Sequence, residues 1–381
     1  MDITSILEFI RKYATPDLLN LIARKPEVQF GTPARPFLLA NYLPVVQKDT
    51  NYIVEDIMRV VGEMIANDSS PLSPPQIKKQ AKGLSMAVAL SHIDIADQYD
   101  GSELKTLGQM LNGSDSSIAE AKIRDWLTNN LRLSLEAKTE LQRSQAIALG
   151  QVTVTPMDGA PFTVDFPSDP GNRVTVPSGT VAAPTGFYSQ TTNPIIQYLV
   201  SGRISLQNQG YEPRALIGSS KIAGVISQNP MVLAAGGSII INSSGNLQQT
   251  ITQVSDAQLN AQLLANGLPP FTRYDRRYRT QTGTSRYFPE NYLVLIGATG
   301  RDTEIIDYTD ERDLKRQLIN DTLGYVGEGI CDGQTQPGAV ITVKTSELKP
   351  VGVYGEAYTN RFPLLLDYNA IRAWQILDPT P

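Results

Sequence analysis

Residues 322–377 read TLGYVGEGICDGQTQPGAVITVKTSELKPVGVYGEAYTNRFPLLLDYNAIRAWQIL, and this stretch decides the class of fold. Short runs of β-forming residues alternate with glycine and proline breaks, which predicts several strands joined by turns. An apolar run over 363–369 then leads directly into a second one over 370–377. The segment carries no recognisable spacing of catalytic residues. It therefore predicts a sheet with a structural role, in a protein that packs against copies of itself.

The other strong signal is a helix predicted over residues 117–149. Ser117 and Glu120 have the S-x-x-E spacing of a capping box, and Gly150 is expected to end the helix. At about 1.5 Å per residue it would be close to 50 Å long, which suits a spine that braces a sheet. Apolar residues recur at four-residue steps, at Ile123, Leu127, Leu131 and Leu135. Trp126 lies beside this stripe, and we expect it to be buried. Charged residues are expected to form a solvated face: Arg124, Asp125, Arg132, Lys138, Glu140 and Arg143.

Upstream of this helix the signals are weaker. Residues 3–25 look like a helix broken at Pro16, and little beside it in the sequence could cover its apolar face, so we expect it to dock on a neighbouring molecule or a shell surface. Residues 31–53 carry three prolines and no clear period, which favours an extended arm. Residues 54–103, with a break at 69–76, favour an extended loop that reaches a neighbour.

Downstream, strands alternate with shorter helices. Residues 151–167 predict a β-hairpin whose turn is Asp158-Gly159. The next expected elements are a helix from Pro194, then a short strand over 215–217, a glycine turn and a helix that ends near Pro230. A helix opened by Ser255 or Asp256 and closed by Gly267 follows, and strands are expected in 271–279, 291–297, 339–345 and 352–359. The class of fold expected from this pattern is α+β.

Composition excludes several classes of protein. The 381 residues are enough for one large domain or two ordinary ones, and 41% of them are hydrophobic. A net charge of −5 argues against tight nucleic-acid binding as the main role. Asp2 and the charges that follow it do not fit a signal peptide, and no apolar run approaches the roughly 18 residues of a membrane span. We therefore expect the chain to fold in a cytosol.

Few residues could carry chemistry. His92 is the only histidine, so any catalytic triad would need it, with Asp94 two residues further on. Cys331 is the only cysteine, so it forms no intrachain disulfide and is expected to be a buried or tolerated thiol. A zinc site built on these two residues would need carboxylates, and no cluster has ligand spacing. We expect no catalytic, cofactor-binding or metal-binding residues.

Three further segments allow a functional interpretation and a structural one. IGSSKIAG, at 217–224, could cradle a phosphate, but its spacing is not that of a P-loop and favours a tight turn from strand to helix. GEGICDG, at 327–333, lacks the aspartate spacing of a calcium loop. The segment 271–288 could bind single-stranded nucleic acid, with its tyrosine rings stacked on the bases and its arginines on the backbone. In an acidic chain, however, the arginines are expected to pair with carboxylates, which favours a salt-bridged strand that faces solvent or a neighbour. Its arginines and tyrosines are Arg273, Arg276, Arg277, Arg279, Arg286, Tyr274, Tyr278 and Tyr287.

Taken in order, these pieces resemble the lambda-type major capsid proteins of tailed bacteriophages, which have the HK97-like fold. FPENYLVLIG (288–297) and PLLLDYNAIRAWQIL (363–377) are most similar to family segments, and the resemblance spans roughly residues 30–378. It implies an α+β chain divided into five parts: an N-terminal arm (1–53), an extended E-loop region (54–103), a peripheral P-domain (104–204) with the spine helix 117–149, an axial A-domain (205–334), and a C-terminal return to the P-domain (335–381).

The resemblance also implies a function. Such a protein is not an enzyme; it assembles into hexamers and pentamers that form the icosahedral head shell around double-stranded DNA. Its implied partners are other copies of itself, a scaffolding protein, a portal protein at one vertex and possible decoration proteins, with weak non-specific contact to the packaged DNA and none to a membrane. It would be assembled in the host cytoplasm and reside in the virion. The alternatives are an encapsulin-like nanocompartment shell, another phage structural protein, or an enzyme with a poorly marked site.

Overall fold

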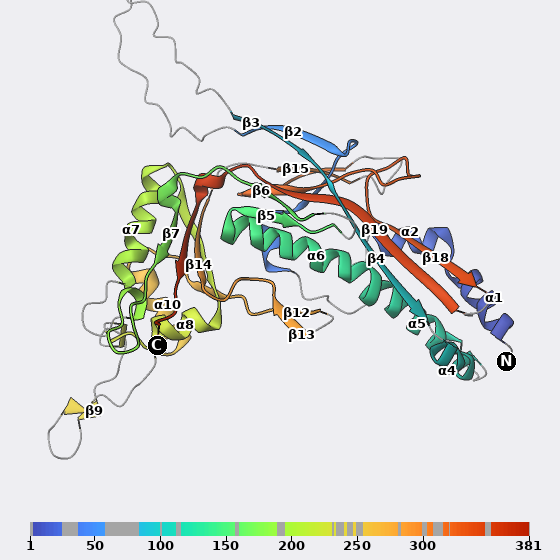
Figure 1. Ribbon diagram of the computed structural model, residues 1–381, viewed down its shortest axis with the longest axis horizontal. Helices are drawn as coiled ribbons and strands as arrows, with labels where there is room; N and C mark the ends of the chain where they lie inside the picture. Colours follow the sequence, from blue (N-terminus) through green and yellow to red (C-terminus); the bar gives the residue numbers. More distant parts are fainter. Residues whose placement is uncertain are drawn as a thin grey trace, which may run out of the picture.

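The fold is described from a computed structural model, in which one long helix joins two β-sheets (Figure 1). The longer sheet runs along the helix, and the second sheet lies across one end of it. The residues that the structure describes are 3–24, 37–57, 84–99, 101–111, 116–156, 160–188, 195–230, 232–233, 240–241, 247–248, 254–280, 283–298, 303–307, 315–319, 321–346 and 352–380.

The long helix occupies the predicted range 117–149. It runs without a break through α5 (Ser117–Asp125), the π-helical η2 (Trp126–Arg132), α6 (Leu133–Ser144) and the π-helical η3 (Gln145–Leu149). Gly150 ends it in the left-handed conformation, with φ of 71°, as predicted. The predicted capping box is wrong. The N-cap is Ser116, whose backbone is already helical and whose side chain makes no capping bond.

The longer sheet packs against one side of this helix. Its strands follow the order β1 (Val45–Gln47), β17 (Gly324–Glu328), β19 (Gly352–Leu365) and β18 (Val340–Ser346), and β4 (Ser91–Tyr99) pairs with the other edge of β19. Buried side chains of β4, β18 and β19 meet the apolar stripe of the helix in one core. The stripe residues Ile123, Leu127, Leu131 and Leu135 are almost fully buried there, as the four-residue steps predicted.

A proline inside β19 shows how the pairing of this strand changes along its length. The Asn360 carbonyl accepts a hydrogen bond from the Gly329 amide, on the side where β17 lies. Because backbone groups alternate between the two edges of a strand, Pro363 faces the opposite edge, where the pairing with β4 has already stopped at Ser91 and Arg361. No ladder bond is therefore lost to the missing N–H group of Pro363.

The second sheet has the order β11 (Phe271–Arg273), β8 (Glu212–Gly218), β14 (Tyr292–Ala298), β20 (Ile371–Ile376) and β7 (Arg173–Val176). Helix α7 (Ile195–Asn208) covers one face, and η3 of the long helix packs on the other (Figure 1). Gly202 of α7 lies against the Trp374 ring, which occupies the space that a Cβ atom would need. The C-terminal strands were expected to return together to the sheet beside the spine. β18 and β19 do so, but β20 turns away after η6 (Tyr368–Ala370) and joins this second sheet.

The N-terminal helices differ from the expectation of a segment without a local partner. Helices α1 (Ile3–Tyr13) and α2 (Pro16–Arg24) pack on their own chain, against α4 (Gly101–Leu111), β18 and the start of the long helix. Their apolar faces are buried there through Ile6, Leu7, Ile10 and Ile22. The apolar face is therefore covered without a neighbouring molecule.

The described part of the expected arm also lies on its own chain. Leu39, in η1 (Leu38–Asn41), and Leu43 are fully buried, and β1 pairs in parallel with β17. Residues 37–47 therefore form a strap that fixes the long helix to β17 rather than an extended arm.

A two-stranded ribbon leaves the body at the start of β4. β2 (Tyr52–Ile57) pairs antiparallel with β3 (Leu84–Ala89), and only Leu90 separates β3 from β4. Figure 1 shows the ribbon extending away from the long helix. The break predicted at 69–76 lies outside the described residues.

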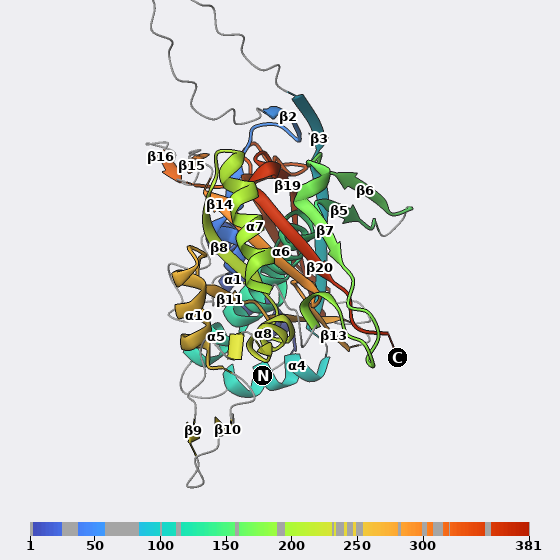
Figure 2. The ribbon, with the colours of Figure 1, turned by 90° about the vertical axis from the view of Figure 1, so that its left-hand side faces the viewer.

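The remaining elements are short helices and two-stranded ribbons (Figure 2). The predicted hairpin is β5 (Gln151–Val154) paired with β6 (Phe162–Asp165), and its turn at Asp158-Gly159 lies outside the described residues. Helix α10 (Asp256–Ala265) begins at the N-cap Ser255, whose capping-box partner is Gln258. The others are η4 (Pro170–Asn172), η5 (Gly186–Tyr188), α8 (Ser220–Ser227), β9 (Ile240–Ile241) with β10 (Leu247–Gln248), β12 (Arg277–Thr280) with β13 (Gly283–Arg286), and β15 (Thr303–Asp307) with β16 (Lys315–Ile319).

Candidate functional site

A buried ionic network ties the long helix to the longer sheet. Arg361 of β19 is 1% exposed and lies between two carboxylates. Its Nη1 atom is 2.7 Å from Oε1 of Glu136 on α6, and its Nε donates to Oε1 of Glu328 on β17 at 2.7 Å. Thr139 and Thr359 also take part, through hydrogen bonds to Arg361 and Glu328. One guanidinium therefore joins a helix and two strands that are far apart in sequence.

A second part of the network ties the helix to the strap 37–47 and to the second sheet. The buried Glu140 accepts hydrogen bonds at Oε1 from the Leu39 amide (3.1 Å) and from the Tyr274 hydroxyl (2.5 Å). Its Oε2 lies 3.4 Å from Nη1 of Arg143, whose Nε donates to the Leu43 carbonyl at 2.8 Å. The strap and the segment that directly follows β11 are thus both bound to the carboxylate of Glu140.

The pKa values of the two glutamates of this network are shifted in opposite directions. Burial raises the pKa of Glu136, but the charges of Arg132, Arg361 and Arg143 outweigh that effect and hold the pKa below its usual value of 4.5. Burial also raises the pKa of Glu140, and there the opposing contacts, of which Arg143 is the strongest, do not fully offset it. Burial and the Glu140 carboxylate together raise the pKa of Tyr274, so this phenol stays a donor at all working pH values.

Removal of the Tyr274 hydroxyl should weaken the attachment of the long helix at Glu140. Tyr274→Phe keeps the buried ring but leaves Glu140 without one hydrogen bond. Because hydrogen bonds to charged groups contribute about 1.5–3 kcal/mol, the free energy of unfolding should fall by about that amount. Denaturant unfolding measures the loss, and Tyr278→Phe, at a half-buried ring with no bond to the network, is the control. Equal stability of the two variants would contradict this role for Tyr274.

The sequence did not reveal this network. Arg132, Glu140 and Arg143 were expected on a solvated face of the helix, but they are 6%, 0% and 2% exposed. That part of the prediction is wrong, because the charged face meets a sheet and a strap instead of water. The one available signal was the i, i+3 and i, i+4 spacing of carboxylates and arginines along 132–143, which fits buried pairs and solvated pairs equally well.

The residues considered for catalysis are not arranged for it. His92 is exposed on β4, and its Nδ1 atom lies 2.9 Å from Oδ1 of Asn360. Asp94 lies two residues along the same strand and is also exposed. Cys331 is buried, and burial raises the pKa of its thiol, which donates to the Gly338 carbonyl at 3.3 Å. A thiol in this setting is a poor nucleophile.

The turn of IGSSKIAG is a strand-to-helix turn, as the structural interpretation predicted. Ser219 caps α8 by accepting a hydrogen bond from the Ile222 amide. The Asp275 carboxylate accepts hydrogen bonds from the amide and hydroxyl of Ser220, and the amide is 3.1 Å away. A side-chain carboxylate thus already occupies the anion-binding end of this helix, where a phosphate would have to lie.

The arginines of 271–288 mostly have partners within the chain. Arg273 pairs with Asp256, and Arg286 pairs with Asp275 and with Glu290. The Arg276 guanidinium lies 3.9 Å from the centre of the Phe37 ring. Tyr274 and Tyr287 are buried at 6% and 5% exposure, so these two rings cannot stack on bases. Arg277 and Arg279 are exposed on β12.

Neither a metal site nor a membrane span is found in the described part of the chain. Glu328, in the glycine-rich GEGICDG, is held by Arg361 and Thr359. No group of three metal-ligating side chains occurs among the described residues. None of the described helices combines the length and the apolar character needed to cross a bilayer.

Solved structures with a similar arrangement of sheets and helix identify the fold. No protein-family profile matches the sequence, and no curated protein matches it either. A crystal structure of a prophage protein of Escherichia coli CFT073, described there as the capsid protein, matches with a TM-score of 0.50 over 99% of both chains, at 12% identity. The chain has the HK97-like capsid fold.

A phage-related protein from Bordetella bronchiseptica RB50 has the same architecture. It matches with a TM-score of 0.50 and 11% identity over 95% of this chain and 96% of the other. The HK97-like fold therefore accounts for both sheets and the long helix together.

Proposed function

We propose that this protein is the major capsid protein of a tailed bacteriophage. It assembles into hexamers and pentamers that form the icosahedral head shell around double-stranded DNA, and it is not an enzyme. The observation that carries the proposal is the match to a prophage capsid protein over 99% of both chains. It is assembled in the host cytoplasm and resides in the virion.

The parts of the fold are proposed to correspond to the parts of a capsid subunit. The longer sheet and the helix 117–149 form the P-domain, with the helix as its spine. The second sheet with α7, α8 and α10 forms the A-domain, and it includes β7 and β20 from outside the range 205–334. The ribbon β2–β3 is the base of the E-loop. The buried network at Arg361 and Glu140 supports this division, because it would hold the two domains at a fixed angle.

Assembly is proposed to proceed through many weak contacts. Each subunit of a closed shell contacts several others, so modest pairwise affinities combine into a stable particle. A scaffolding protein, a portal protein at one vertex and possible decoration proteins are the expected partners. Contact with packaged DNA would be weak and non-specific. The exposed Arg277 and Arg279 are candidates for that contact or for a contact between subunits.

Electron microscopy of the purified protein tests this function. Expressed alone or with a scaffolding protein, it should form shells, tubes or capsomer rings. A compact monomer whose light scattering does not depend on concentration would contradict the proposal. Particles that copurify with a protein cargo instead of DNA would favour a nanocompartment shell.

A further inference from the structure

The hairpin β12–β13 presents two arginines to solvent. Arg277 and Arg279 are both exposed, and neither has an ion pair or a hydrogen bond among the residues that the structure describes. Tyr278 between them points the other way, because its ring packs on that of the buried Tyr287, with 5.0 Å between the ring centres. Since side chains alternate along a strand, Arg277 and Arg279 share the face of the hairpin that points away from the body.

One of these arginines lies beside a like charge. Arg277 is directly opposite Arg286 in the register of the hairpin. Asp275 and Glu290 neutralise Arg286, but no carboxylate of the described residues pairs with Arg277. Like charges that face each other directly destabilise a pair of strands. An anion bound on this exposed face would relieve that repulsion.

The charge of this part of the chain is opposite to that of the whole. Segment 271–288 contains five arginines and one aspartate, whereas the chain has a net charge of −5. A polyanion is therefore repelled by the average surface of the protein and attracted at this hairpin. Contact with a polyanion should be local and should depend on these arginines.

The spacing of the two arginines fits the backbone of a duplex. Two residues along a strand span about 6.8 Å. The phosphates of one DNA strand advance by about 3.4 Å each along the helix axis, so this span covers two steps. A guanidinium binds a phosphate through two parallel hydrogen bonds.

Single-stranded nucleic acid fits the hairpin less well. Its recognition depends on aromatic rings that stack on the bases. Tyr274 and Tyr287 are buried, and Tyr278 packs on Tyr287, so these three rings are not available for stacking. The side chains therefore favour a polyanion whose bases are already paired.

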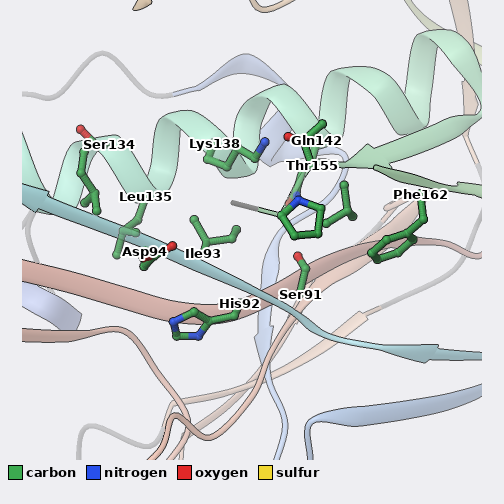
Figure 3. A pocket seen from close by; sticks show the side chains of 13 residues that line it. Ser91, His92, Ile93, Asp94, Ser134, Leu135, Lys138, Gln142, Thr155 and Phe162 are labelled. Carbon is green, nitrogen blue, oxygen red and sulfur yellow. The ribbon is translucent and has the colours of Figure 1, made fainter. Parts of the chain in front are cut away.

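Lys138 also has no ion pair or hydrogen bond within the described ranges, but its surroundings exclude a duplex. It lines a groove between β4, α6 and the hairpin β5–β6 (Figure 3). Leu135, Val154 and Phe162 line the same groove, and burial lowers the pKa of the Lys138 ammonium group. A half-buried cation among apolar walls does not lie along a continuous row of phosphates.

The hairpin and the ribbon β2–β3 lie on opposite sides of the long helix. Figures 1 and 2 both show the ribbon above the helix and the hairpin below it. In a closed shell that encloses DNA, the cationic side of the subunit is the one that suits the interior.

We propose that the hairpin β12–β13 lines the inside of the shell and binds the phosphate backbone of duplex DNA through Arg277 and Arg279. This inference rests on the proposed shell function, and it chooses a DNA contact over a subunit contact for these two residues. Two phosphate contacts per copy make a weak attachment, and the many copies of a shell add up to a firm one. The contact reads no sequence, because phosphates carry none.

Binding of a random-sequence DNA duplex to dispersed subunits tests the hairpin. The variant Arg277→Gln, Arg279→Gln should bind the duplex about tenfold more weakly, or worse, at low salt. For the wild type, the logarithm of the binding constant should fall against the logarithm of salt concentration with a slope of about −1.8, and the slope of the variant should approach zero. Arg277→Lys, Arg279→Lys keeps both charges and should keep the slope. A Gln variant that binds as the wild type does would overturn the proposal.

The matched control is Arg11→Gln, Arg214→Gln. It removes the same charge from two exposed arginines that have partners within the chain, on α1 and on β8. Because exposed charges more than a Debye length apart are screened, its affinity for the duplex should stay within about twofold of the wild type. An equal loss in the control and in the hairpin variant would reduce the effect to net charge and overturn the proposal.

Assembly separates a DNA contact from a contact between copies. The hairpin variant should form empty shells at the same subunit concentration as the wild type. A higher requirement would assign Arg277 and Arg279 to a subunit contact and overturn the proposal. Closed empty shells should not bind added duplex, and shells that bind it as well as dispersed subunits do would overturn the inner placement. If the wild type forms no particles, the shell function fails, while duplex binding by the dispersed subunits still decides whether the hairpin binds DNA.

Discussion

Replacement of Arg361 by alanine is expected to lower the free energy of unfolding by about 3–5 kcal/mol and to prevent assembly. Arg361 is fully buried and holds Glu136 and Glu328 together. Without the guanidinium, Glu328 is left as a charge at 4% exposure with no cation beside it. The loss comes from these unpaired charges more than from the contacts of the arginine itself.

Two controls separate charge from packing. Arg279→Ala removes an exposed arginine and should change stability by no more than about 0.5 kcal/mol. The triple variant Arg361→Met, Glu136→Gln, Glu328→Gln removes the cation and both anions, so it should recover much of the loss. Denaturant unfolding of the dispersed subunits measures all three. A loss below about 1 kcal/mol in Arg361→Ala would show that water or another cation takes over the role of the guanidinium.

The effect of Arg361→Ala should depend on pH in a defined direction. The network holds the pKa of Glu136 below its usual value of 4.5. The stability that Glu136 contributes is therefore complete above pH 4.5 and is lost as the pH falls below it. In the variant, the buried carboxylates can take up protons more readily. The difference in stability between wild type and variant should shrink from pH 7 to pH 4, and a difference that grew over this range would contradict the assignment.

The sequence predicted the long helix and the first hairpin, because both depend on residues that are close together in the chain. The helix 117–149 has its own apolar stripe and its own terminal Gly150, and both retain their roles in the fold. The hairpin predicted for 151–167 forms, and it pairs Val152 with Val164. These features need no knowledge of distant residues, because propensity and turn chemistry act within a few positions.

Features that depend on distant partners were not predictable. Glu136 and Glu140 look like solvated helix residues until Arg361 and Tyr274, more than 130 positions away, are brought beside them. The end of β19 and most of β20 are apolar, and the sequence does not tell which sheet each one joins, since that depends on the turn at 366–370. The candidate site was missed for the same reason, because it consists of contacts between elements.

The second large effect is expected at Trp126, where the long helix meets β4 and β19. Trp126 is 5% exposed, as its place on the apolar stripe predicted. Its Nε1 donates to Oδ2 of Asp97 at 2.8 Å, and its ring meets that of Tyr99 edge-on at 4.9 Å. Gly355 lies so close that a Cβ atom there would be 2.5 Å from the indole. Trp126→Ala should therefore cost about 3–5 kcal/mol, through lost burial and the cavity that remains.

Trp126→Phe separates the ring from its hydrogen bond. It keeps most of the buried volume but removes the indole donor, and Asp97 retains its hydrogen bonds from Asn130 and from the Gln98 amide. The expected loss is about 1–2 kcal/mol, and particles should still form. Trp126→Ala should form none, because the long helix would no longer be held in one position on the longer sheet. Soluble Trp126→Ala subunits that assemble as the wild type does would show that the other buried stripe residues and the Arg361 network suffice to hold the helix to the sheet.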